Sequence, residues 1–156
     1  MKRAISTLVV AFALAAVLAA SAIAAPAAGS TLVITHKVQG CHIWALNGAR
    51  PAVNQTIRLH PGQTLTIRNN DVMPHQLIKT SGSAIVMRLL APGTMSTGTL
   101  KAPYAGGMMP HMASVLRVSF PKAGTYVLKT KAGEDYMAGV KTVGEDNVLK
   151  VKVVVG

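Results

Sequence analysis

The sequence predicts an all-β fold, a Greek-key antiparallel β-sandwich, from three observations. Polar and apolar residues alternate with a period of two through several short segments, which is the pattern of half-buried strands. Clusters rich in Gly, Pro, Asn and Asp separate these segments, as turns do in a sandwich. Patterns typical of helices are nearly absent. Roughly 130 residues follow the N-terminal segment, which is enough for one such domain and too few for two.

The N-terminal segment has the composition of a secretory signal peptide. A short basic start precedes an apolar run at 8–20, and small residues at Ala22 and Ala24 form a cleavage site. We therefore expect residues 1–24 to be removed, residues 25–156 to form the domain, and the protein to be periplasmic or secreted. An uncleaved N-terminal anchor is the alternative, although the apolar run is short for a membrane span. No later segment of the sequence is apolar enough to span a membrane.

Each expected strand is bounded by residues that interrupt the alternation. The turn at 38–40 separates the first two strands, and Asn47-Gly48 ends the second. A loop-rich stretch at 91–107 follows the apolar segment, and a polar stretch at 130–147 precedes the last strand. The expected strands are 31–38, 41–46, 54–60, 64–68, 76–79, 114–120, 125–129 and 148–155, with the apolar segment at 84–90.

The most regular part of the chain is the stretch 54–77. Two alternating strands lie on either side of Pro61-Gly62, which predicts a tight turn between them. The cluster Asn-Asn-Asp-Val-Met-Pro at 69–74 then ends the second strand. His75 follows at the foot of a third strand, so we expect its imidazole at one rim of the sandwich.

This order of strand, Pro-Gly turn, strand, Asn-Asn and Pro-His resembles the core of the cupredoxins, the plastocyanin-type blue copper proteins. His75 matches the first copper-ligating histidine of that family. The segment 120–128 resembles the family's Gly-Thr-Tyr strand, which leads to the copper-ligating cysteine, but the matching position holds Thr130 and no histidine follows His111. The resemblance implies a cupredoxin-like fold over nearly all of residues 25–156, with a non-standard ligand set.

The cupredoxin arrangement further implies that four connections lie at one end of the sandwich and gather soft and imidazole donors there. His60 falls at the opposite end and His36 lies within a strand, so both are expected to be bystanders. Thiolate, thioether and imidazole are the donors that copper prefers, whereas Ca²⁺ or Mg²⁺ would need clustered carboxylates. Copper is therefore the expected cofactor. The candidate metal ligands are Cys41, His42, His75, His111, Met112 and Met137.

Each candidate also has a purely structural interpretation. The only cysteine, Cys41, is equally explained as an inert buried thiol. Instead of binding a metal, His42 could pack beside Trp44, the methionines of 108–112 could fill a gap under a loop, and Met137 could anchor the final loop. Cys41 and His42 are adjacent, so both can bind one ion only if a bulge or a loop lets them face the same way.

The expected function is single-electron transfer through a mononuclear Cys/His/Met copper site. Two alternatives remain open, a periplasmic Cu(I) carrier or assembly factor and a metal-free β-sandwich interaction module. Without Lys2 and Arg3 of the expected signal peptide, the 16 Lys+Arg become 14, against 5 Asp+Glu. So basic a chain suggests an acidic redox partner protein, a copper donor or acceptor, or an anionic cell-surface polymer. A solvated basic surface without a partner is the alternative. Nucleic acid is not expected because the few aromatic residues do not interleave with the basic ones. An enzyme is not expected because no Ser/His/acid set is present.

Overall fold

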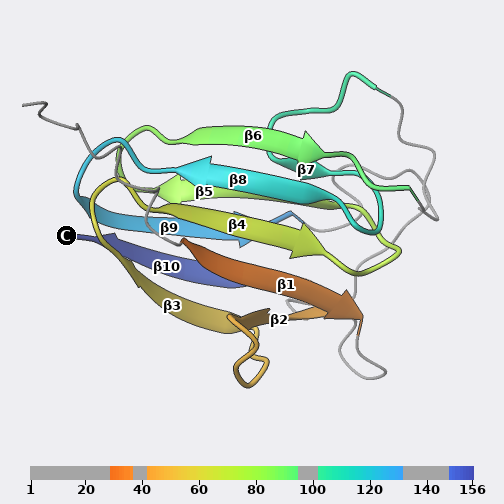
Figure 1. Cartoon of the computed structure of the whole chain (residues 1–156), viewed down its shortest axis with the longest axis horizontal. Helices are drawn as coiled ribbons and strands as arrows, with labels where there is room; N and C mark the ends of the chain where they lie inside the picture. The colour runs from red at the N-terminus through yellow and green to blue at the C-terminus, as the bar shows by residue number, and fades with distance from the viewer. Residues whose placement is uncertain (1–28, 37–41, 95–101, 132–147) are drawn as a thin grey trace, which may run out of the picture.

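The computed structural model describes residues 29–36, 42–94, 102–131 and 148–156. The regular secondary structure of these residues consists of β-strands. These strands form two five-stranded sheets that pack face to face (Figure 1). The all-β sandwich predicted from the sequence is confirmed. None of the described residues forms a helix long and apolar enough to cross a membrane. The strands are β1 Ser30–His36, β2 His42–Leu46, β3 Asn54–Leu59, β4 Thr64–Asn69, β5 His75–Ser81, β6 Val86–Ala91, β7 Met108–Met109, β8 Val115–Ser119, β9 Gly124–Thr130 and β10 Lys150–Val155.

The directions of neighbouring strands differ in two pairs from those of a purely antiparallel sandwich. The first sheet has the order β2-β1-β4-β8-β6 and the second β3-β10-β9-β5-β7. The pairs β1–β4 and β10–β3 are parallel, while the other pairs are antiparallel. The sandwich is therefore mainly antiparallel, as expected, with two parallel pairs that the sequence does not predict. Alternation of polar and apolar residues fixes which face of a strand is buried, but it does not fix the direction of the neighbouring strand.

The core lies between the two sheets and is built by the alternation seen in the sequence. In β4, Leu65 and Ile67 are fully buried whereas Arg68 is exposed. The single tryptophan, Trp44, is also fully buried, and its indole N–H donates a 3.0 Å hydrogen bond to the carbonyl of Val53. The polar edge of the largest side chain in the core therefore has a partner.

The turn between β3 and β4 has the form predicted from Pro61-Gly62. The backbone N–H of Gln63 donates to the carbonyl of His60 at 3.0 Å. Gly62 has a φ of 83°, a left-handed conformation that glycine adopts without steric strain. His60 precedes the start of β4 and His75 follows its end, so the two residues lie at opposite ends of the sandwich, as expected from the sequence.

The expected strand segments correspond closely to the observed ones, with shifts at their ends. β10 begins at Lys150, two residues later than the alternation indicates, whereas positions 37 and 38 of the first expected strand lie outside the described residues. The sequence does not predict β7, because two consecutive buried methionines show no alternation. The proposed signal peptide, residues 1–24, lies outside the described residues.

Candidate functional site

Several chain connections meet at one end of the sandwich, which we call the His75 pole after the first residue of β5. The backbone N–H of Asn70 donates to the carbonyl of Ile34 at 2.8 Å, so the end of β1 lies beside the β4–β5 connection. The backbone N–H of Lys131 donates to the carbonyl of Gln76 at 2.8 Å, so the end of β9 lies there as well. These contacts confirm, for the described strand ends, that the connections expected to carry donors start from a common pole (Figure 1).

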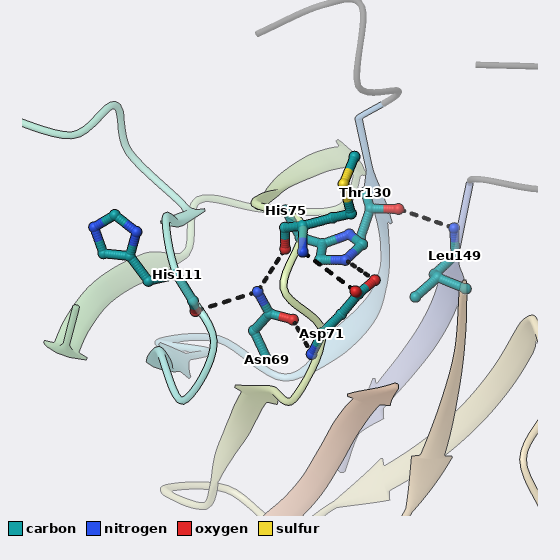
Figure 2. Close-up of polar contacts among 7 residues, drawn as sticks. Asn69, Asp71, His75, His111, Thr130 and Leu149 are labelled. Atoms are coloured by element: carbon teal, nitrogen blue, oxygen red, sulfur yellow. Dashed lines mark hydrogen bonds and ion pairs between the residues drawn. The ribbon is translucent and has the colours of Figure 1, made fainter. Parts of the chain in front are cut away.

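The imidazole of His75 is buried at this pole, with 1% of the residue exposed. Its Nε2 atom lies 3.3 Å from Oδ2 of Asp71 (Figure 2). Both side chains are almost fully buried, at 2% and 0% exposure. When Nε2 carries the proton, it donates to the carboxylate, and Nδ1 is then the ring nitrogen with the lone pair. The contact with Asp71 thus orients the ring of His75.

Asp71 is itself held in place by the residues of the β4–β5 connection. Its backbone N–H donates to Oδ1 of Asn69 at 2.9 Å, and its own Oδ1 accepts a 3.2 Å hydrogen bond from the backbone N–H of Met73. Figure 2 shows this network beneath the ring of His75. One carboxylate oxygen therefore supports the turn while the other faces the imidazole.

His111 contributes its backbone to the pole, but its ring points away from His75 (Figure 2). The carbonyl of His111 accepts a 3.3 Å hydrogen bond from Nδ2 of Asn69. Its Nε2 lies 3.1 Å from the hydroxyl of Tyr104, and the two rings meet edge to face with centroids 5.9 Å apart. Its Nδ1 is buried and has no hydrogen-bond partner among the described residues. The structure therefore does not bring the rings of His75 and His111 together.

The other candidate ligands are described only in part. Met112 lies beyond β7 and is 36% exposed. His42 is the first residue of β2, directly opposite His36 in the register, and its side chain is not described. Cys41 and Met137 lie outside the described residues. Among the residues that are described, no group of three or more His, Cys, Asp or Glu side chains is placed to hold a metal.

Thr130 occupies the position at which the resemblance to cupredoxins would place a cysteine. It is fully buried, and its Oγ1 accepts a 2.9 Å hydrogen bond from the backbone N–H of Leu149. Its own backbone N–H donates to the carbonyl of Leu149 at 2.9 Å. The hydroxyl thus helps to join the end of β9 to the residue that precedes β10.

Sequence reasoning missed two features of the pole. The sequence pattern assigns Asp71 only to a turn, although it precedes His75 by four residues and the other acids all fall within 134–146. The same pattern makes His36 a bystander within a strand, but it is the last residue of β1 and therefore lies at the His75 pole. The spacing of Asp71 and His75 is the signal that could have revealed the first feature.

Comparison with known proteins gives a likeness in fold. No family model matches the chain, and no curated protein matches it. The structure is similar to a reduced variant of amicyanin, with 18% identity and a TM-score of 0.42 over 86% of this chain and 88% of that chain. It is also similar to amicyanin from Paracoccus versutus, with 15% identity and a TM-score of 0.42 over 85% and 86% of the two chains. A purple cupredoxin from Nitrosopumilus maritimus has 14% identity and a TM-score of 0.41 over 79% and 97%. These identities and TM-scores are too low to establish the family or the function.

The chemistry of the described residues fits a transition-metal ligand at one position. A buried imidazole with one ring nitrogen next to a carboxylate is a common arrangement around protein-bound metals. His75 has this arrangement, with Asp71 as the carboxylate. The pole thus offers one well-oriented imidazole donor.

Proposed function

We propose that this protein binds a single copper ion at the His75 pole and passes single electrons to and from a partner protein. The observation that supports this proposal is the buried imidazole of His75, fixed by Asp71 at the position that the cupredoxin pattern gives to a ligand. Because the ring of His111 points away from it, His42 is the second imidazole of the proposed site. Cys41 supplies the thiolate, and Met137 or Met112 supplies a weak thioether.

The protein frame suits such a role because it holds the imidazole of His75 in one orientation. Bound copper would supply a one-electron couple, and thiolate, imidazole and thioether donors stabilise both of its oxidation states. The carboxylate of Asp71 keeps the His75 ring oriented, and the fully buried Met109 pairs with His75 across β5 and β7. In this proposal the protein acts outside the cytoplasm, after removal of residues 1–24, and catalyses no reaction of its own.

Two other functions have an observation in their favour. The exposed thioether of Met112 at the same pole favours a Cu(I) carrier, which must release its ion to another protein. The hydroxyl of Thr130, at the position where the resemblance would place a cysteine, is bonded to the backbone N–H of Leu149 and favours a metal-free interaction module. The three functions differ in what the protein does with copper, so one set of spectra separates them.

The deciding experiment is a titration of the purified protein with Cu(II), followed by visible absorption and electron paramagnetic resonance. We expect one equivalent to produce an intense thiolate-to-copper band that is lost in His75→Ala and in Cys41→Ser. His60→Ala removes an exposed imidazole at the opposite end and serves as the control that should keep the band. Cys41→Ser leaves the Asp71–His75 pair intact, so the test holds even if His75→Ala fails to fold.

The same experiment identifies the alternatives. A colourless, readily exchanged Cu(I) complex would replace electron transfer by copper delivery. Failure to bind either oxidation state in stoichiometric amount would refute a copper function and leave the interaction module. Retention of the band in Cys41→Ser would show that the thiolate is not a ligand, and the proposed ligand set would then be wrong.

A further inference from the structure

The outer face of the first sheet carries three exposed arginines on neighbouring strands. Arg68 lies on β4, Arg117 on β8 and Arg88 on β6, and Figure 1 shows these strands side by side. The residues before and after each arginine are more buried than the arginine itself. Since side chains alternate between the two faces of a strand, all three guanidinium groups lie on the face that turns away from the core.

The register brings these charges close together. Arg88 is directly opposite Arg117 across β6 and β8. Thr66 is directly opposite Arg117 across β4 and β8, so Arg68, two residues further along, is its diagonal neighbour. Directly opposite residues have Cβ atoms about 5 Å apart, and diagonal neighbours are about 7–8 Å apart. Like charges at these separations repel, so the three arginines, which we call the arginine row, oppose the pairing of their own strands.

The described acidic residues do not neutralise this charge. The chain has five acidic residues, of which Asp71 is buried beneath His75 and the other four, within 134–146, lie outside the described residues. Within the described part of the chain, the structure gives no ion pair to any guanidinium group of the row. The row is therefore a concentration of positive charge that the protein does not neutralise with its own described residues.

The side chains around the row distinguish among anionic partners. Val86 and Leu90 flank Arg88 along β6 and are 57% and 41% exposed. Arginine next to exposed apolar side chains is typical of surfaces that bind proteins, whereas a polysaccharide or a lipid headgroup gains little from the apolar residues. The basic residues of β4, β8 and β6 are all arginines. A planar guanidinium group can bind a carboxylate through two parallel hydrogen bonds, which a lysine ammonium group cannot do.

We propose that the outer face of β4, β8 and β6 is a docking surface for an acidic protein, whose carboxylates bind the guanidinium groups of Arg68, Arg88 and Arg117. This proposal says where the partner protein of the proposed function binds, and it does not depend on copper binding. Arg68 directly precedes Asn69, so the row begins next to the His75 pole. A partner on this face would lie beside the proposed metal site.

The test uses the copper-free protein, so that its outcome is separate from that of the copper titration. Binding of a fluorescein-labelled poly-L-glutamate peptide is followed by fluorescence anisotropy at low ionic strength and at about 0.15 M salt. The variant Arg68→Thr/Arg88→Thr/Arg117→Thr is expected to bind about tenfold more weakly than the unchanged protein. The matched control, Arg50→Thr/Arg58→Thr/Lys122→Thr, removes the same charge from exposed positions outside the arginine row. Its affinity for the peptide is expected to fall by less than about threefold.

Recognition by the guanidinium groups is separated from simple charge attraction by a third variant. Replacing all three arginines of the row by lysine keeps the charge, and it is expected to weaken binding about threefold because the bidentate geometry is lost. Thermal melting of each variant shows that it is folded. Equal losses in the two threonine triples would show that net charge alone binds the peptide, and would overturn the proposal. Unchanged poly-glutamate binding in the arginine-row variant, with loss of binding to heparin or to vesicles of anionic lipid, would also overturn it.

Discussion

Replacing Asp71 by alanine is expected to destabilise the copper-free protein by about 3 kcal/mol. The substitution removes the 3.3 Å contact with Nε2 of His75 and the 3.2 Å bond from the backbone N–H of Met73. A hydrogen bond to a charged group contributes about 1.5–3 kcal/mol. Both distances are long, and removing a buried carboxylate also relieves its desolvation, so the lower end of that range applies to each bond.

A double-mutant cycle isolates the part of this energy that belongs to the Asp71–His75 pair. The cycle compares Asp71→Ala, His75→Ala and the double variant, and we expect a coupling energy of about 1.5 kcal/mol. Asp71→Asn is the matched control, because its side-chain oxygen can still accept from the backbone N–H of Met73 while the carboxylate is lost. We expect it to be destabilised by about half as much as Asp71→Ala.

The assay is urea unfolding of the copper-free variants, followed by the fluorescence of the single tryptophan. Trp44 is fully buried in the core, so its emission is expected to shift when the sandwich opens. Equal slopes of free energy against urea are required for the comparison. A coupling energy within about 0.5 kcal/mol of zero would refute the reasoning, because residues that act independently give this result.

Three smaller predictions follow from other features of the sandwich, each measured as a free energy of unfolding. Gly62→Ala should lose about 1 kcal/mol because its φ of 83° strains an L side chain, whereas Gly106→Ala, with ordinary φ and open space around it, should be nearly neutral. Thr130→Val should lose about 1–3 kcal/mol, because it leaves a buried backbone N–H without its acceptor, and a neutral result would contradict the role given to Oγ1. Arg117→Thr should gain about 0.2–1 kcal/mol by ending the repulsion with Arg88, and a loss of stability would show that the arginines support the sheet.

The sequence predicts the faces of the strands well because burial is a local property of alternating side chains. Leu65 and Ile67 are fully buried and Arg68 is exposed, as their spacing indicates. Strand direction and pairing depend on distant segments, so the parallel pair of β1 with β4 and the short strand β7 could not be predicted in this way.

The candidate site is predictable in part for a similar reason. The position of His75 follows from the turn that precedes it, and the structure places it at the pole. The ring of His111 contacts Tyr104, and a tight turn follows it in which Ala113 has a φ of 67° and Ser114 Oγ lies 2.6 Å from the carbonyl of His111. No residue pattern specifies this turn. The roles of Cys41 and Met137 stay predictions.

The position of Asn69 has a consequence for how the pole opens. Its backbone N–H donates to the carbonyl of Ser114, its carbonyl accepts from the N–H of Ala113, and its side chain donates to the carbonyls of Met73 and His111. Asn69 therefore joins the β4–β5 connection to the β7–β8 connection, and His111 in the second of these lies 42 residues after Asn69 in the chain. Local opening that breaks these bonds must release both connections together, so their backbone amides should exchange hydrogen with solvent as one cooperative unit.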